Sequence, residues 1–133
     1  MKIFLDTNVL VSSFITRGLC ADLFRIIVAE HELILSDYIL TELETVLTQK
    51  INLPAEQVKD IKKYLKSFLI IKNHTPPIDI KLRDKDDIPV LAAALNSGAD
   101  FLVTGDKDLL TENNNYNIQI VDPKQFLTII KSK

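Results

Sequence analysis

The sequence contains little cysteine, glycine and histidine, and each shortage excludes a class of site. The single cysteine, Cys20, can form neither an internal disulfide nor a cysteine-based metal cluster. Three glycines do not provide a glycine-rich phosphate-binding loop. His31 and His74 have no partner at metal-ligand spacing and no serine or cysteine arranged for nucleophilic catalysis. We interpret Cys20 as a small apolar filler and both histidines as surface residues.

A strong net charge and long hydrophobic runs are also missing. The formal net charge of −2 argues against a basic coat that grips nucleic acid, although it leaves room for a locally basic groove. The apolar runs are far shorter than a membrane span, and a strand-like run stands at the amino terminus in place of a signal peptide. We therefore expect a soluble cytoplasmic protein without a membrane partner.

Hydrophobic residues make up 47% of the 133 residues, which is enough for one domain over residues 1–133 with a sizeable core. Short apolar runs, expected to be strands, occur at Ile3–Leu5, Leu33–Leu35, Leu69–Ile71, Phe101–Thr104 and Ile118–Val121. Helical apolar spacing lies between them, and helix starts are expected at Thr7-Asn8, Ser36-Asp37, Pro54-Ala55, Asp87-Ile88 and Asp122-Pro123. This alternation predicts an α/β fold, with a mainly parallel sheet of about five strands between two layers of helices. Residues 73–83, with their two adjacent prolines, are expected to form a loop across the carboxyl edge of the sheet.

An acid follows the first expected strand directly. Asp6 comes after Ile3-Phe4-Leu5, and open α/β sheets bind ligands outside the carboxyl ends of their strands. Thr7 and Asn8 then begin a first helix. Asp6 alone fits a helix cap and a catalytic acid equally well.

Three further acids are expected at the same edge of the sheet. Asp87 opens the helix before the fourth strand, and Asp106 follows that strand. Glu42 lies within a helix beside an apolar leucine and is expected to lean toward the same crevice. Several carboxylates buried together are very costly without a cation, so a divalent metal is expected among them. Ligands that are all oxygen atoms favour Mg²⁺ or Mn²⁺ over zinc.

Four motifs, taken in order, resemble the PIN domain family. They are Leu5-Asp6-Thr7-Asn8-Val9-Leu10, Ser36 with Glu42-Leu43, Asp86-Asp87-Ile88-Pro89-Val90-Leu91-Ala92, and Val103-Thr104-Gly105-Asp106-Lys107-Asp108-Leu109-Leu110. The resemblance covers essentially the whole chain and is strongest for the short, single-domain PIN proteins regarded as toxins of toxin-antitoxin modules. It implies a three-layer α/β/α sandwich and a Mg²⁺- or Mn²⁺-dependent endoribonuclease that hydrolyses RNA. It also implies an inhibiting antitoxin protein and, as is common in such proteins, a homodimer.

The resemblance also assigns roles to particular residues. The catalytic and metal-binding acids of the family match Asp6, Glu42, Asp87 and Asp106. Asn8 and Thr104 match polar residues that support and orient those carboxylates. Candidate contacts to RNA phosphates near the crevice are Arg17, Lys81, Arg83, Lys85 and Lys107, although each is also an ordinary type of surface charge.

Some assignments have competitors. Glu44 competes with Glu42, but a step of two residues along a helix turns a side chain well away. Asp84 and Asp86 compete with Asp87, and as loop acids they fit a solvated or outer position better. Asp108 either helps to bind metal or, as we favour, caps the turn at Leu109-Leu110.

Two other kinds of protein would also place acids at this edge. A receiver-like phosphoacceptor domain combines acids with a lysine such as Lys107, but it needs paired acids beside the first strand, where Asp6 stands alone. A catalytically silent PIN-fold binding module needs no acids at all. The presence of acids at all four matched positions favours an active nuclease over such a module.

Overall fold

The computed structural model describes residues 1–72, 80, 82, 85–113 and 115–132. A five-stranded sheet in the order β3-β2-β1-β4-β5 forms its centre, and every neighbouring pair of strands is parallel. The strands are β1 (Lys2–Leu5), β2 (Glu32–Ser36), β3 (Leu69–Ile71), β4 (Phe101–Val103) and β5 (Gln119–Val121). The sequence-based prediction of five strands in a parallel sheet is thus confirmed.

The strands at the middle of the sheet are buried on both faces. In β1, Ile3, Phe4 and Leu5 are at most 1% exposed, which explains why this strand is continuously apolar instead of alternating. Phe4 pairs with Ile34 of β2 on one side and with Leu102 of β4 on the other. The residues that pair between these three strands therefore lie deep in the core.

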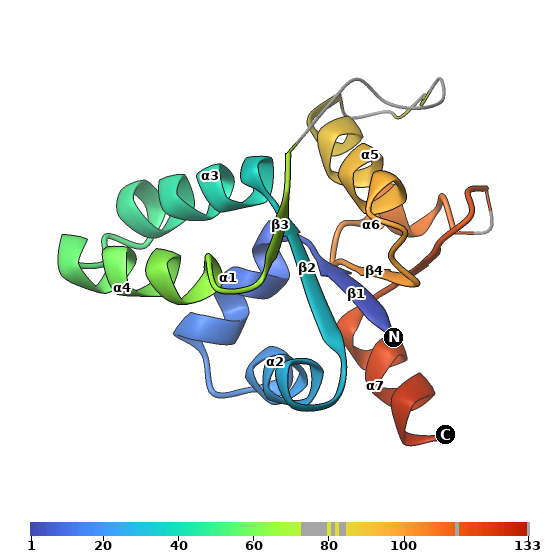
Figure 1. Ribbon diagram of the computed structural model, residues 1–133, viewed down its shortest axis with the longest axis horizontal. Coiled ribbons are helices and arrows are strands. Elements are labelled where there is room, and N and C mark those ends of the chain that lie inside the picture. Colours follow the sequence, from blue (N-terminus) through green and yellow to red (C-terminus); the bar gives the residue numbers. More distant parts are fainter. Residues whose placement is uncertain (73–79, 81, 83–84, 114, 133) are drawn as a thin grey trace.

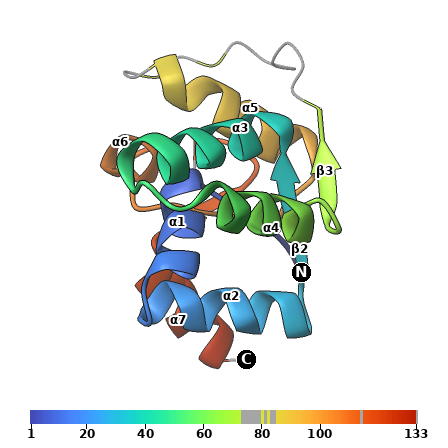
Figure 2. The same ribbon diagram turned by 90° about the vertical axis from the view of Figure 1, so that its left-hand side faces the viewer.

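Within the described residues, seven α-helices connect and cover the strands. They are α1 (Thr7–Ile15), α2 (Leu19–Glu30), α3 (Asp37–Thr45), α4 (Ala55–Leu65), α5 (Ile88–Asn96), α6 (Lys107–Leu110) and α7 (Pro123–Lys131). Helices α1 to α4 lie on one side of the sheet and α5 and α6 on the other (Figure 1). Helices α3 and α4 run beside each other (Figure 2), and α7 packs against α2. This is the three-layer α/β/α arrangement expected of a PIN-like fold.

Local signals in the sequence account for several helix ends. The Ser36 hydroxyl caps α3 by accepting a hydrogen bond from the Ile39 amide at 3.2 Å. Asp122 and Gln125 form a reciprocal capping box at the start of α7. Gly98, just after α5, has a φ of 71°, a conformation that glycine adopts without strain.

Two short helical turns were not predicted from the sequence. The π-helical turn η1 (Val46–Lys50) continues α3, and the 3-10 turn η2 (Lys85–Asp87) precedes α5. The predicted loop over residues 73–83 lies outside the described residues except for Ile80 and Leu82. None of the helices in the described parts of the chain combines the length and apolar character needed to cross a membrane.

The order of the strands reverses at β1. The chain passes from β1 outward to β2 and β3, and then crosses to β4 and β5 on the other side of β1. Beyond the strand ends, the Asp6 amide donates to the Val103 carbonyl at 3.0 Å, which keeps the ends of β1 and β4 together. In open α/β sheets the crevice for ligands lies at such a switch point, so this edge is where a site is expected.

Candidate active site

Asp6 is held at the end of β1 by two hydrogen bonds. One carboxylate oxygen accepts from the Thr7 amide at 2.7 Å, and the other accepts from the Thr104 hydroxyl at 2.6 Å. The residue caps α1 and is only 7% exposed. Burial raises the pKa of Asp6 above its usual value, the two hydrogen bonds oppose that rise, and the nearby Asp106 carboxylate adds to it. Asp6 is therefore both a helix cap and a buried acid with an acidic neighbour.

Thr104 connects the ends of β1 and β4. Its fully buried hydroxyl donates to Asp6 and accepts from the Asp106 amide at 3.0 Å. One side chain thereby orients a carboxylate from one strand and the backbone that follows the next. This contact agrees with the supporting role expected for Thr104.

Glu42 reaches the same edge from α3, which contacts α1. Its Oε1 accepts a hydrogen bond from the Thr7 hydroxyl at 2.7 Å. Partial burial raises the pKa of Glu42, the hydrogen bonds from Thr7 and Tyr38 lower it, and the Asp6 and Asp86 carboxylates raise it further. Glu42 thus lies close to two other acids.

Sequence reasoning missed two of the residues that hold Glu42. Thr7 was interpreted only as a helix starter, and Tyr38 was not singled out. The supporting role expected for Asn8 falls to Thr7 instead, because Asn8 is exposed and donates or accepts no side-chain hydrogen bond within the described part of the chain. Thr7 could have been recognised from its place beside Asp6, whereas Tyr38 lacks a comparable signal.

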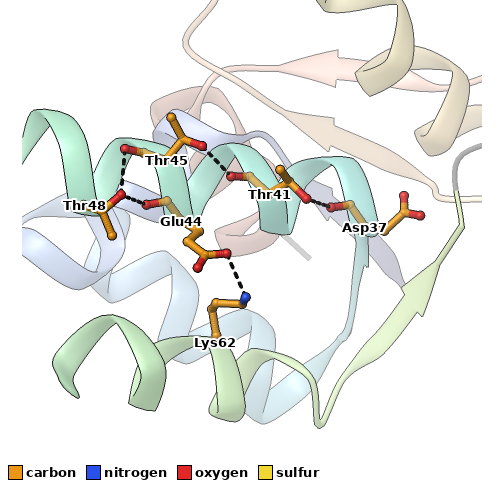
Figure 3. Close-up of polar contacts among 6 residues, drawn as sticks. All are labelled: Asp37, Thr41, Glu44, Thr45, Thr48 and Lys62. Atoms are coloured by element: carbon orange, nitrogen blue, oxygen red, sulfur yellow. Dashed lines mark hydrogen bonds and ion pairs between the residues drawn. The ribbon is translucent and has the colours of Figure 1, made fainter. Parts of the chain in front are cut away.

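Glu44, the competitor of Glu42, points to a different neighbour. Its carboxylate accepts a hydrogen bond from the Lys62 ammonium of α4 at 2.7 Å (Figure 3). The two acids stand two residues apart and consequently face different sides of α3. Glu44 therefore contributes to α3–α4 packing and not to the acid cluster.

Three aspartates converge on the β4 side of the edge. One carboxylate oxygen from each of Asp87, Asp106 and Asp108 lies within 4.8 Å of the other two. Asp87 is buried at the junction of η2 and α5, and Oδ2 of its carboxylate is fully enclosed. The cap of α6 is Asp106, which accepts from the Asp108 amide at 2.8 Å. The favoured assignment of Asp108 as the cap is thus corrected, because α6 begins at Lys107, two residues earlier than a cap at Asp108 requires, and the Asp108 carboxylate lies in the cluster instead.

Asp86 is the remaining acid candidate that the structure describes, and it lies farther out. Asp86 is exposed; its carbonyl accepts from the Tyr38 hydroxyl at 3.4 Å, and its carboxylate is near enough to Glu42 to raise that pKa. This fits the outer position expected for Asp86. Asp84 lies outside the described residues.

Of the candidate contacts to RNA phosphates, two lysines lie near the acids and one arginine does not. Lys85 and Lys107 are exposed and adjoin the acids in the chain, so both stand at the correct edge. Arg17 follows the end of α1, about 13 Å of helix away from the start at Thr7, and is not brought to the crevice. Lys81 and Arg83 fall outside the described residues.

Of the histidines and cysteine in the described part of the chain, His31 and Cys20 both lie away from the site. His31 lies near the terminal amine of Met1, at 3.4 Å, on the opposite edge of the sheet, and His74 is outside the described residues. Cys20 is partly buried against the core, and burial raises the pKa of its thiol. This fits its interpretation as an apolar filler.

The acids form a continuous group with an oxygen-only donor set. Asp6 lies beside Glu42 and Asp106, and Asp106 belongs to the cluster with Asp87 and Asp108. Within the described residues no lysine or arginine forms an ion pair with Asp6, Glu42 or Asp106. Such a group of hard oxygen donors fits a divalent cation of the Mg²⁺ or Mn²⁺ type.

Two solved structures resemble this fold at low sequence identity. The structure of VapBC2 from Rickettsia felis, bound to a fragment of promoter DNA, matches with a TM-score of 0.64 and 18% identity over 92% of this chain and 98% of that chain. FitAcB from Neisseria gonorrhoeae matches with a TM-score of 0.59 and 18% identity over the same shares, 92% and 98%. No curated protein matches the sequence. The structural likeness confirms the expected architecture.

The family comparison reaches the same conclusion through the sequence. The model of the PIN domain matches residues 2–108, a span that runs from β1 to the aspartate cluster after β4. It includes every acid placed at the crevice above. The resemblance found in the order of the motifs is thus confirmed, and the chain belongs to the PIN domain family.

Proposed function

We propose that this protein is a divalent-metal-dependent ribonuclease that hydrolyses RNA phosphodiester bonds, as the toxin of a toxin-antitoxin module. The main support is the convergence of carboxylate oxygens from Asp87, Asp106 and Asp108 within 4.8 Å, with Asp6 alongside. Carboxylates gathered at the switch point of a parallel sheet favour a cation and, through it, a phosphate group.

The residues that would hold the cation are Asp6, Asp87 and Asp106, with Asp108 as a further oxygen donor and Glu42 reaching the cation through water. When bound, Mg²⁺ or Mn²⁺ stabilises charge on the phosphate and makes water more acidic. Thr104 and Thr7 keep Asp6 and Glu42 oriented by hydrogen bonds at 2.6 and 2.7 Å. The chain thereby presents its carboxylates before any ligand arrives.

Glu42 is the acid that we assign to proton transfer. It is more exposed than Asp6, and its pKa is raised by burial and by neighbouring carboxylates. A carboxylate of raised pKa is a better base for water than an unperturbed one. In this mechanism Glu42 accepts the proton of the attacking water, and the reaction needs no covalent enzyme intermediate.

Cleavage of RNA by the purified protein tests this proposal. We expect cleavage with Mn²⁺ or Mg²⁺, none in EDTA, and a loss of at least about 100-fold in kcat for Asp6→Asn. Asp60→Asn, which neutralises an exposed acid on α4, is the matched control and should retain activity. Full activity of Asp6→Asn with metal present would refute the assignment.

Membership of the PIN family argues against the receiver-like alternative. The catalytically silent binding module makes a different prediction, namely that the acids bind no Mn²⁺. Isothermal titration calorimetry with Mn²⁺ separates the ribonuclease from the silent module. The ribonuclease requires Mn²⁺ binding, and Asp87→Asn should weaken that binding.

The regulatory part of the proposal concerns a protein partner. Motif resemblance to toxins implies an antitoxin, and the similar VapBC2 structure was solved on a DNA fragment from their promoter. We expect a small DNA-binding protein in a neighbouring reading frame whose co-expression relieves growth arrest and inhibits RNA cleavage. Light scattering on the purified chain tests the accompanying homodimer, which should give twice the mass of the 133-residue chain.

A further inference from the structure

An open pocket of about 250 Å³ adjoins Glu42 on the outer side of α3. Its lining residues are Tyr38, Thr41, Glu42, Thr45, Val46 and Lys50. We propose that this pocket holds a nucleotide next to the scissile phosphodiester, with Lys50 contacting a backbone phosphate and the threonines contacting the sugar. The inference rests on the proposed ribonuclease function and adds a substrate subsite to it.

The π-helical turn places Lys50 in this pocket. Glu42 and Lys50 are eight residues apart, and in an uninterrupted α-helix they would point about 80° away from each other. In η1 the Ile51 amide instead donates to the Val46 carbonyl at 3.0 Å, an i to i+5 bond. This wider turn holds more residues than an α-helical turn and rotates Lys50 back toward the face of Glu42. The lysine and the acid consequently line one pocket.

Lys50 supplies positive charge beside an acidic site. It is exposed, and it forms no ion pair with any described residue. Carboxylates alone would repel the phosphates that flank the bond to be cleaved, and a neighbouring ammonium offsets that repulsion. Lys50 is therefore placed to position the chain of a nucleic acid that enters the crevice.

The two threonines offer hydrogen-bond acceptors to the same ligand. The Thr41 hydroxyl donates to the Asp37 carbonyl at 3.0 Å and the Thr45 hydroxyl to the Thr41 carbonyl at 3.1 Å (Figure 3). Each hydroxyl donates its hydrogen to a carbonyl of the helix, so toward a ligand its oxygen can act only as an acceptor. Acceptors match the hydroxyl groups of ribose, and the 2′-hydroxyl is the group that distinguishes RNA from DNA.

Tyr38 and Val46 complete the pocket with apolar surface. Tyr38 is partly buried, and its hydroxyl lies 3.4 Å from the Asp86 carbonyl, so its ring is fixed between α3 and η2. Aromatic and aliphatic surfaces accept the face of a base or sugar without sequence preference. The Lys50 ammonium, the threonine hydroxyls and the apolar surface of Tyr38 and Val46 together match the phosphate, the sugar and the base of one ribonucleotide.

Charge reversal at Lys50 tests the subsite. We compare Lys50→Glu with Lys131→Glu, an identical change at an exposed lysine on the opposite edge of the sheet, where Lys131 lines a hollow with Met1 and His31. For a short single-stranded oligoribonucleotide, Lys50→Glu should raise KM about 10-fold and lower the slope of log affinity against log salt by about 1. Lys50→Arg should restore both values, and Lys131→Glu should stay within about 2-fold of wild type.

Two further measurements separate the subsite from catalysis and from folding. Hydrolysis of bis(4-nitrophenyl) phosphate, which has no flanking nucleotide, should fall much less than cleavage of the oligoribonucleotide in Lys50→Glu. Thr45→Val keeps the shape of the side chain but removes the acceptor. It should lower the ratio of the affinity for an oligoribonucleotide to the affinity for the matching oligodeoxyribonucleotide. Circular dichroism of each variant checks that the fold is retained.

The outcomes distinguish this inference from the function on which it rests. If wild type cleaves RNA while Lys50→Glu matches it in KM and salt slope, the subsite is refuted and the ribonuclease stands. If Lys50→Glu loses hydrolysis of the small phosphodiester by the same factor as cleavage of the oligoribonucleotide, Lys50 acts on the reaction itself and the subsite is also refuted. If wild type neither binds nor cleaves the oligoribonucleotide, both proposals fall.

Discussion

Asp6 is both a helix cap and a buried acid. It caps α1 through the Thr7 amide and lies buried beside Asp106. Capping stabilises the helix, whereas burial and a like charge oppose ionisation of the same group. The two interpretations of Asp6, as a helix cap and as a buried acid, are therefore compatible, because the geometry at the end of β1 satisfies both.

The raised pKa of Asp6 predicts how stability depends on pH without metal. A carboxyl group whose pKa is higher in the folded state than in the unfolded state stabilises the fold when protonated, and this contribution is lost as pH rises through the folded-state pKa. In EDTA we expect the free energy of unfolding of Asp6→Asn, measured relative to wild type, to rise between about pH 4 and neutral pH, on top of the pH-independent cost of losing the acceptor for Thr104. Thermal unfolding at several pH values checks this. A relative free energy that stays constant or falls over this range would contradict it.

Thr104 offers a second prediction at the scale of single residues. Thr104→Val preserves shape but removes the hydroxyl that serves both Asp6 and the Asp106 amide. Because a buried group loses its partner, we expect a loss of about 1–3 kcal/mol in the free energy of unfolding, measured with urea. Thr128→Val, at an exposed hydroxyl of α7, should cost less than about 0.5 kcal/mol. Equal losses in the two variants would argue against this role for Thr104.

Helix α3 shows how one element sorts its side chains by rotation about its axis. Thr7 holds Glu42 at the crevice, Lys62 holds Glu44 against α4, and η1 returns Lys50 to the side of Glu42. Helical periodicity predicted the separation of the two glutamates correctly. It could not predict the position of Lys50, because a π turn changes the number of residues per turn without a clear mark in the sequence.

Two helix caps provide a prediction at the element scale. Asp106 and Asp122 both cap helices, but only Asp106 belongs to the acid cluster. We expect Asp106→Ala and Asp122→Ala each to lower the free energy of unfolding of the metal-free protein by about 1 kcal/mol. Calorimetry should show weaker Mn²⁺ binding only for Asp106→Ala. Equal Mn²⁺ affinity in both variants would remove Asp106 from the metal site.

The whole molecule brings together acids that are far apart in the sequence. Asp6 and Asp106 are 100 positions apart, and they meet because β4 returns to pair with β1 after the chain has built β2 and β3. Repulsion among the gathered carboxylates is a cost that the fold carries until a cation offsets it. Stability of the entire fold should therefore depend on divalent metal.

Binding of a divalent metal should stabilise the whole fold. Mn²⁺ at roughly a hundredfold above its Kd should stabilise the protein by about 2.7 kcal/mol, since the cation binds only the folded chain. Thermal unfolding with and without EDTA measures this. Asp87→Asn should remove most of the gain, whereas Asp60→Asn should keep it. A gain of equal size in Asp87→Asn would show that the cation binds elsewhere.

The strands, most helix starts and the family could be predicted from the sequence alone, because apolar periodicity, caps and motif order are local properties that can be seen along the chain. The sequence also singled out Asp6, Glu42, Asp87 and Asp106 as candidates, since each stands at a predicted strand end or on a predicted helix face. The contacts among these candidates followed from the folded arrangement. It joined Asp108 to the aspartates, gave the support of Glu42 to Thr7 and Tyr38, and brought Lys50 beside that acid. These contacts depend on where a helix begins and how far it turns relative to a distant strand, and neither quantity is encoded in the spacing of neighbouring residues.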